Sequence, residues 1–369
     1  MDKRPPIDIP GEGIDPKRGE DLLGGKINPL AFKRNSTLMK SSVEALALLI
    51  KMGDLVALSK GITLIESTKD ADKERARDLI KMCLKDSISS VRVGISGSPG
   101  VGKSTFIESL GLQLVNQNKK VAVLAIDPSS SITGGSILGD KTRMMNLSIH
   151  PNAFIRPSPA RKALGGVARH TREAIILCEA AGFDTILIET VGVGQSETLV
   201  QSMVDLFLLL ILPGAGDDLQ GIKRGVVEMA DLVVINKADG DRVNAAKLSK
   251  AFYLQALHLF PAKENGHAVK VLACSSTQSE GIVEVWEEIN SIIQINKKLG
   301  LFAKNREQQL LHWFRDTIQN NLYDSFFNFP GIKEEMIDLQ KQILNHLTSP
   351  FMAADLLLKR FFDQLHNHK

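Results

Sequence analysis

The chain has 369 residues, 43% of them hydrophobic and 24% charged, and its formal net charge is +3. This composition is typical of a globular protein with room for one large α/β domain and attached segments. A net charge this small gives no overall field that would attract nucleic acid or an anionic membrane. The three cysteines have no C-x-x-C spacing, which favours a reducing compartment and predicts neither a metal site nor a disulfide framework.

The sequence pattern carries no membrane or targeting signal. Its longest apolar run, Leu206–Leu212, has the length of a buried strand. The N-terminus has no hydrophobic signal core and mixes acidic with basic residues, whereas a transit peptide is poor in acids. We therefore expect a cytoplasmic protein that binds neither a membrane nor nucleic acid.

Two segments precede the first predicted strand. Residues 1–40 are rich in Pro, Gly and charge without a sustained period, which predicts an arm that is disordered or lies on another surface. Residues 41–88 have helical spacing and predict two or three helices that cover one flank of a sheet. The expected apolar positions are Val43, Leu46, Leu48, Leu49 and Met52 in the first helix and Ala76, Leu79, Ile80 and Cys83 in the last.

The stretch Gly97–Ser104 matches the phosphate-loop pattern G-x-x-x-x-G-K-[ST], between a strand-like Val91–Ser96 and a helical Thr105–Leu110. Glycines let backbone N–H groups surround phosphates, and the helix N-terminus adds a positive dipole end. Lys103 should reach the β- and γ-phosphates, and the Ser104 hydroxyl should bind Mg²⁺. The predicted phosphate-binding residues are Gly97, Ser98, Pro99, Gly100, Val101, Gly102, Lys103, Ser104 and Thr105.

Strand-then-helix units repeat after this loop and predict a doubly wound, mostly parallel sheet within residues 89–295. Several of the strands are apolar throughout, as strands covered on both faces should be. Asp127, Glu189 and Asn236 lie at or just past strand ends, so we expect them on the same edge as the phosphate loop. The later strands are expected at Val121–Ile126, Thr185–Glu189, Leu206–Leu212, Leu232–Asn236 and Val269–Ala273.

The tetrapeptide Asn236-Lys237-Ala238-Asp239 matches N-K-x-D and favours guanine over adenine. A carboxylate at Asp239 accepts from both the ring N–H and the exocyclic amine of guanine. The Asn236 amide is expected at the opposite edge of the base, and the Lys237 stem over the ring. After the next strand, Cys274, Ser275 and Ser276 are expected to place backbone N–H groups near the guanine carbonyl.

Three acidic positions are candidates for holding Mg²⁺. Glu189-Thr190-Val191-Gly192 resembles D-x-x-G with Glu for Asp, so Gly192 should donate to the γ-phosphate and Glu189 should hold the metal directly or through water. Asp127 and Asp140 flank a Gly-containing loop and are further candidates. The alternative for either is a solvated loop acid with a capping role. The predicted metal-binding residues are Ser104, Asp127, Asp140 and Glu189.

The C-terminal part, from Glu284 onward, has helical spacing again, with amphipathic stretches at Asn305–Tyr323 and Ile332–Leu347. Pro350 interrupts the pattern, and Met352–Gln364 resumes it. This last stretch has more large apolar residues than one solvated helix needs. Packing onto the chain's own core and a subunit interface are both open at this point.

Long motifs resemble those of the MeaB/ArgK/MMAA group, from about Ser41 to the C-terminus. They are GSPGVGKS, AIDPSSSITGGSILGDKTRM, ETVGVGQSE and GDDLQGIKRGVVEMADLVVINKAD. These proteins are SIMIBI-class P-loop GTPases that act as chaperones of adenosylcobalamin-dependent acyl-CoA mutases, chiefly methylmalonyl-CoA mutase. The resemblance implies a homodimer with a C-terminal helical dimerisation arm over residues 296–369. It also implies that GTP hydrolysis gates cofactor delivery and protects or reactivates the mutase.

The same resemblance implies roles for single residues. Asp127 and Asp140 fall in switch I, and Glu189 begins switch II. Lys223 falls in a further switch that answers to the mutase, although by itself it is only part of a basic pair with Arg224. The residues with implied catalytic roles are Lys103, Asp140, Glu189 and Lys223.

Two other functions stay open from the sequence. A small-molecule kinase of the ArgK type would use the same phosphate loop, and no second, acceptor-binding motif is visible. A GTPase for metal-centre maturation would typically carry a Cys/His stretch, whereas the eight histidines here are scattered. The expected cofactors in the leading hypothesis are GTP or GDP and Mg²⁺.

Overall fold

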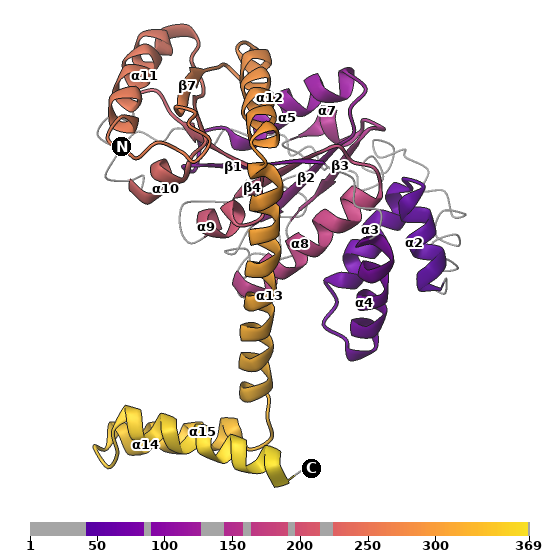
Figure 1. Cartoon of the computed structure of the whole chain (residues 1–369), viewed down its shortest axis with the longest axis vertical. Helices are drawn as coiled ribbons and strands as arrows, with labels where there is room; N and C mark the ends of the chain where they lie inside the picture. The colour runs from indigo at the N-terminus through magenta and orange to yellow at the C-terminus, as the bar shows by residue number, and fades with distance from the viewer. Residues whose placement is uncertain are drawn as a thin grey trace, which may run out of the picture.

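The structure is a computed structural model that describes residues 42–84, 90–126, 144–157, 164–190, 196–214 and 224–367. Figure 1 shows a sheet between layers of helices, one long helix that leaves this body, and a helical hairpin at its far end. The N-terminal arm predicted at residues 1–40 lies outside the described residues. Within them, none of the helices combines the length and the apolar character needed to cross a bilayer.

The sheet has seven strands in the order β3-β2-β4-β1-β5-β6-β7, and each neighbouring pair is parallel. This confirms the predicted doubly wound fold. The prediction missed β3, which has only four residues. The strands are β1 (Val91–Gly97), β2 (Val121–Ile126), β3 (Ala153–Arg156), β4 (Thr185–Thr190), β5 (Leu206–Ile211), β6 (Leu232–Ile235) and β7 (Lys270–Ala273).

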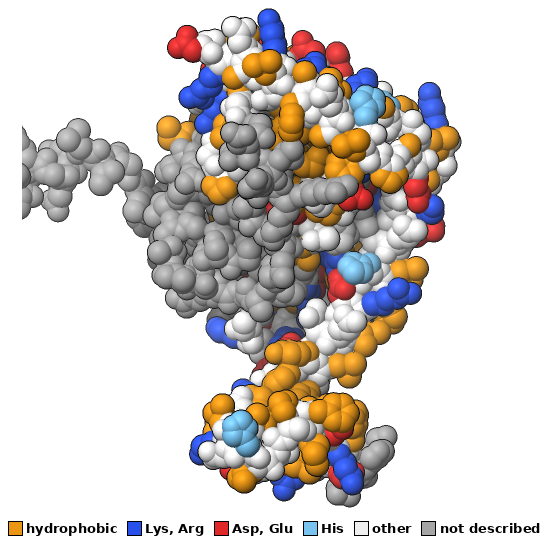
Figure 2. Space-filling view, turned by 90° about the vertical axis from the view of Figure 1, so that its left-hand side faces the viewer, with side chains coloured by type: hydrophobic (Ala, Val, Ile, Leu, Met, Phe, Trp, Pro, Cys, Tyr) orange, Lys and Arg blue, Asp and Glu red, His pale blue; other side chains and the backbone are white. Residues whose placement is uncertain are grey.

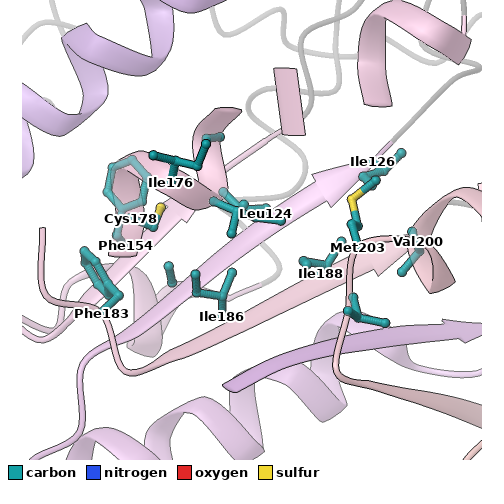
Figure 3. Close-up of a cluster of buried hydrophobic side chains, with 14 of the residues drawn as sticks. Leu124, Ile126, Phe154, Ile176, Cys178, Phe183, Ile186, Ile188, Val200 and Met203 are labelled. Carbon is teal, nitrogen blue, oxygen red and sulfur yellow. The ribbon is translucent and has the colours of Figure 1, made fainter. Parts of the chain in front are cut away.

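Helices cover both faces of the sheet, so alternate strand residues enter two different hydrophobic cores. Ile186 and Ile188 lie in the core that Figure 3 shows in part, whereas Leu187 lies in the opposite one. Burial on both faces explains why the strands are apolar throughout. On the side of Ile186 lie α8 (Leu164–Ala180), α9 (Ser196–Gln201), α10 (Arg224–Met229) and α11 (Val243–Leu257); on the side of Leu187 lie α5 (Lys103–Asn116), α7 (Met145–Ser148) and α12 (Ile282–Lys298).

Three N-terminal helices pack against α8, as the helical spacing predicted: α2 (Val43–Lys51), α3 (Leu55–Ile65) and α4 (Asp70–Leu84). Asp54 caps α3 by accepting a hydrogen bond from the N–H of Ala57 at 2.7 Å. The predicted apolar face of α2 was wrong in part, since Leu48 and Met52 are 61% and 74% exposed. Ile50 is buried instead, because the stripe facing the other helices repeats at three, four and seven residues.

The C-terminal region is a helical arm, with α13 (Leu301–Phe327), α14 (Ile332–Leu344) and α15 (Pro350–Asn367). In Figure 1, α13 runs away from the sheet and α14 and α15 form a hairpin at its end. The hairpin has a small core of its own, in which Leu339, Leu357 and Phe361 are buried. The predicted break in the helical pattern before Pro350 is confirmed, since α14 ends at Leu344 and Pro350 begins α15. Proline is tolerated there because the first turn of a helix needs no N–H from it.

Candidate nucleotide site

The phosphate loop joins the end of β1 to the start of α5. Its glycines are required by geometry: Gly102 has φ +94°, and a Cβ on it would lie 2.8 Å from Nδ2 of Asn236. A Cβ on Gly97 would lie 2.5 Å from the carbonyl oxygen of Leu210 on β5. The loop can therefore pass close to β5 and to the N-K-x-D segment only without side chains at these two positions.

Lys103 is a buried cation at the first residue of α5. Its ammonium donates to the carbonyl oxygens of Gly97 at 2.8 Å and Ser98 at 3.3 Å. The side chain is thus folded back across the loop that should surround the phosphates. A phosphate oxygen there would offer the ammonium a charged acceptor, and hydrogen bonds between ionised partners are stronger than those to carbonyls.

Two of the four predicted metal-binding residues meet beside this loop. The Ser104 hydroxyl donates to Oε1 of Glu189 at 3.1 Å, and Glu189 is buried at the end of β4. A hydroxyl and a carboxylate at the carboxyl ends of parallel strands are oxygen donors of the kind that Mg²⁺ prefers, so these residues fit the ion. When bound, Mg²⁺ would neutralise charge on the β- and γ-phosphates.

The remaining switch predictions cannot be placed, because Asp127, Asp140, Gly192 and Lys223 lie outside the described residues. Among the described residues, no group of three or more His, Cys, Asp or Glu side chains lies together in a way that could hold a metal ion.

A hydroxyl pair that the sequence analysis missed lies directly under the site. Oγ1 of Thr190 donates to Oγ of Ser96 at 2.9 Å, and both residues are fully buried. Ser96 precedes Gly97 and Thr190 follows Glu189, so this bond fixes the start of the phosphate loop relative to the acid. Ser96 precedes the phosphate-loop pattern and Thr190 fills a variable position of the D-x-x-G-like segment, so neither motif marks these hydroxyls. Only the pairing of β1 with β4 brings them together.

Asn236 ties three loops together. Its Nδ2 donates to the carbonyl of Val101 at 2.9 Å, and its Oδ1 accepts from the hydroxyl of Ser276 at 2.7 Å and from its N–H at 3.2 Å. The side chain is buried. The side-chain amide of Asn236 has two N–H donors, and the contact with Val101 uses one of them. The predicted contact with the base would therefore use the second N–H. The structural role of Asn236 was not predicted.

The carboxylate expected to recognise guanine is oriented by hydroxyl groups. Oδ2 of Asp239 accepts from the hydroxyl of Ser275 and, at 3.3 Å, from that of Thr277. Lys237 has φ +57° and donates from Nζ to the carbonyl of Gly100 at 2.7 Å. Its stem therefore extends from the N-K-x-D segment to the phosphate loop, as a side chain lying over a base would. Thr277 was not among the predicted residues.

The loop after β7 uses its backbone N–H groups within the protein. Those of Cys274, Ser275 and Ser276 donate to Ile235 O, Glu280 O and Asn236 Oδ1 at 2.8, 3.0 and 3.2 Å. In this arrangement they hold the loop in place, and a contact with a guanine carbonyl would require one of them to change partner. Burial raises the pKa of the Cys274 thiol to about 12, which keeps it neutral beside Asn236.

These features define the class of P-loop GTPases. They are a phosphate loop, a lysine and a metal-ligand pair beside it, and an N-K-x-D segment, all on an all-parallel sheet. Within this class, the chain belongs to the family described as "Methylmalonyl Co-A mutase-associated GTPase MeaB", which matches residues 58–330. The resemblance stated from the motifs and the expected GTPase activity are thereby confirmed.

Named relatives agree with this assignment. A mouse protein named "Methylmalonic aciduria type A homolog, mitochondrial" is 46% identical over 319 residues, which cover 84% of this chain and 77% of the mouse protein. GTPase ArgK of Escherichia coli is 38% identical over 318 residues, which cover 85% and 96%. A crystal structure described as "LAO/AO transport system kinase" superposes with a TM-score of 0.70 at 32% identity, over 87% of this chain and 98% of that one.

Proposed function

We propose that this GTPase is a chaperone of methylmalonyl-CoA mutase or of a closely related acyl-CoA mutase, and that it gates adenosylcobalamin loading and protects or reactivates that enzyme. The observation that carries the proposal is the match of residues 58–330 to a mutase-associated GTPase family. The contacts of the nucleotide site support the GTP-dependent part of the proposal, because Lys103 lies buried in the phosphate loop and Ser104 meets Glu189 beside it.

In this proposal the output of hydrolysis is a conformational signal. Binding of the γ-phosphate with Mg²⁺ orders loops at the carboxyl edge of the sheet, and hydrolysis releases them. Lys103 stabilises charge on the phosphates, Ser104 and Glu189 hold the metal, and Asp239 selects guanine. The roles of Asp127, Asp140, Gly192 and Lys223 rest on the sequence motifs alone.

The proposal includes a homodimer formed through the arm. Figure 2 shows hydrophobic side chains gathered along α13 and on the hairpin. Phe314, Leu322 and Phe351 are 63%, 63% and 75% exposed, which is unusual for large apolar side chains in such number. A self-complementary contact between two arms would bury them. Sedimentation analysis of the F314E and F351E variants should give monomers if this interface is correct, and unchanged dimers would exclude it.

The decisive experiment measures GTP turnover by the purified protein with and without an adenosylcobalamin-dependent methylmalonyl-CoA mutase. We expect slow basal turnover that the mutase accelerates. The acceleration by the mutase should be lost in Lys223→Ala, and Lys103→Ala should slow turnover strongly both with and without the mutase. Turnover that is indifferent to the mutase would overturn the chaperone proposal and leave the GTPase assignment intact.

The same assay tests a second candidate function. One relative of known structure is described as a transport system kinase, and a kinase would use the same phosphate loop. Released inorganic phosphate that accounts for all consumed GTP supports hydrolysis. Label from γ-³²P-GTP that appears on an amine metabolite instead would support the kinase.

A further inference from the structure

The short helix α9 lies against the strand that leads into the phosphate loop. A Cβ on Gly94 of β1 would come within 2.6 Å of Val200 and 3.2 Å of Val204, so α9 and the turn after it touch β1 where no side chain intervenes. Gly94 is on the same strand as Gly97, and α9 is the first helix after Glu189 and Thr190. A displacement of β1 at Gly94 would therefore press directly on α9, because close-packed interiors leave no free space to absorb it.

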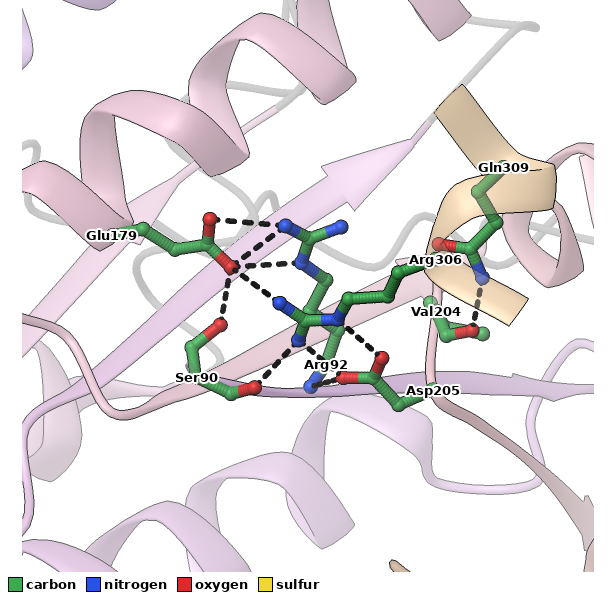
Figure 4. Close-up of polar contacts among 7 residues, drawn as sticks. All are labelled: Ser90, Arg92, Glu179, Val204, Asp205, Arg306 and Gln309. Atoms are coloured by element: carbon green, nitrogen blue, oxygen red, sulfur yellow. Dashed lines mark hydrogen bonds and ion pairs between the residues drawn. The ribbon is translucent and has the colours of Figure 1, made fainter. Parts of the chain in front are cut away.

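The turn after α9 is held by the arm helix α13. Nε2 of Gln309 donates to the carbonyl of Val204 at 2.7 Å. Arg306 donates to both carboxylate oxygens of Asp205, at 2.8 and 2.7 Å. Figure 4 shows these contacts coming from one turn of α13. The segment between α9 and β5 is thus attached to the arm by its backbone and by a charged side chain.

Arg172 on α8 adds a third attachment between the same two elements. Its Nη2 donates to the hydroxyl of Ser202 at 2.8 Å, and its Nη1 donates to Oδ2 of Asp316 on α13 at 2.9 Å. Ser202 in turn donates to the carbonyl of Leu199 on α9 at 2.7 Å. One guanidinium therefore joins the end of α9 to α13.

The burial of this guanidinium makes the connection stiff. Arg172 is 5% exposed, and its Nε is buried without a hydrogen-bond partner. A buried charge is strongly destabilising when a partner is removed. A movement of α9 that left α13 behind would cost Arg172 one of its two contacts in a place where water does not replace it. Moving both helices together keeps both contacts.

We propose that α9 transmits the state of the nucleotide site to the arm, with Arg172 as the shared contact that makes α13 follow α9. The coupling rests on GTP binding alone and does not depend on which enzyme the protein serves. Because coupling between two sites is reciprocal, whatever holds the arm would also change the preference of the site for GTP over GDP.

Amide hydrogen exchange of the full-length protein tests this proposal, with saturating GDP compared with saturating guanosine 5′-[β,γ-imido]triphosphate. In the wild-type protein, exchange should differ between the two nucleotides both in residues 196–205 and in residues 306–320, by about fivefold or more. In Arg172→Ala the difference should persist in residues 196–205 and fall clearly in residues 312–320, around Asp316, while Arg306 and Gln309 still hold the start of α13.

Two further variants keep the test interpretable. Asp316→Asn removes the charge at the α13 end without shortening the side chain, and it should give the same reduced response in residues 312–320 if Arg172→Ala does not fold. Arg156→Ala breaks the ion pair with Glu66, which attaches α3 to β3, and it should leave the response of α13 as in the wild type. Exchange in residues 306–320 that ignores the nucleotide in the wild type would overturn the proposal. So would a response of residues 312–320 that is as large in both Arg172→Ala and Asp316→Asn as in the wild type.

Discussion

At the carboxyl edge of the sheet, polar side chains bond mainly to backbone carbonyls and to hydroxyls of neighbouring loops, whereas at the amino edge they form buried ion pairs. Lys103, Lys237 and Asn236 each donate to carbonyls of the phosphate loop. A bound nucleotide could replace these contacts or form further ones with the same side chains. The contacts therefore hold the loops in place, while the lysine ammonium groups can still bind phosphate.

At the amino edge, buried ion pairs join the strands to α8 and α13 (Figure 4). Arg92 donates from Nε and Nη2 to the two carboxylate oxygens of Glu179 at 2.9 Å, and Arg306 binds Asp205 in the same forked way. Burial by itself would lower the pKa of Arg306, but hydrogen bonding to Asp205 and the charges of Asp205 and Glu179 raise it. Substitutions at the amino edge should therefore lower the free energy of unfolding, whereas substitutions at the carboxyl edge should weaken nucleotide binding.

Arg306→Leu is the strongest test of the amino edge. It leaves Asp205 and Glu179 buried with one cation fewer, so the free energy of unfolding should fall by about 3–5 kcal/mol. Urea unfolding measures this. The control is Arg360→Ala, which breaks a pair with Glu335 in the hairpin whose arginine is 60% exposed, and it should cost about 1 kcal/mol or less. Equal losses in the two variants would refute the assigned difference.

Lys103→Ala is the corresponding test of the carboxyl edge. Loss of a cation that should stabilise charge on the phosphates is expected to slow GTP turnover by about 100- to 1000-fold. Lys103 donates to two loop carbonyls and not into the buried ion pairs of the amino edge, so unfolding by urea should change little. A variant that turned over GTP normally but unfolded easily would reverse the comparison.

Asp239→Asn tests whether the carboxyl edge selects the base. An amide cannot accept from both N–H groups of guanine, and GTP affinity should fall by roughly 100-fold for the loss of charged hydrogen bonds. Xanthosine triphosphate presents a carbonyl in place of the exocyclic amine, so its affinity should rise. Fluorescent nucleotide titrations measure both. Unchanged GTP affinity would remove the assignment of guanine specificity.

Gly94→Ala probes the contact that lies between the two edges. The added methyl group meets Val200 at 2.6 Å, and overpacking of this kind typically costs about 1–3 kcal/mol. Gly225 in α10 is a matched control, since nothing lies within 4 Å of its missing Cβ. Gly225→Ala should be neutral or stabilising by about 0.4–1 kcal/mol. Thermal unfolding compares the two.

The sequence pattern predicted all strands but one, and the motifs indicated a nucleotide-binding loop at the end of β1, because both signals are local. The short strand β3 was missed, since four residues carry too little periodicity to be recognised. Leu48 was assigned to the wrong face of α2 because five apolar residues in one helix fit more than one stripe.

What the sequence did not predict depends on contacts between distant segments. Arg306 meets Asp205, and Thr190 meets Ser96, only after the strands have taken their order in the sheet. The same holds for Arg172, which reads as an ordinary charged residue of an amphipathic helix. No local pattern marks such residues, because their partners are set by topology.

The position of β1 in the sheet has a consequence for how the chain is made. Of the described strands it is synthesised first, yet its neighbours are β4 and β5, which follow much later in the sequence. Until Leu206–Ile211 has left the ribosome, this central strand has no completed partner on one side, and long-range parallel pairing is slow. The nascent chain therefore carries its phosphate loop well before both neighbours of β1 are complete, with an apolar strand exposed to aggregation in the meantime.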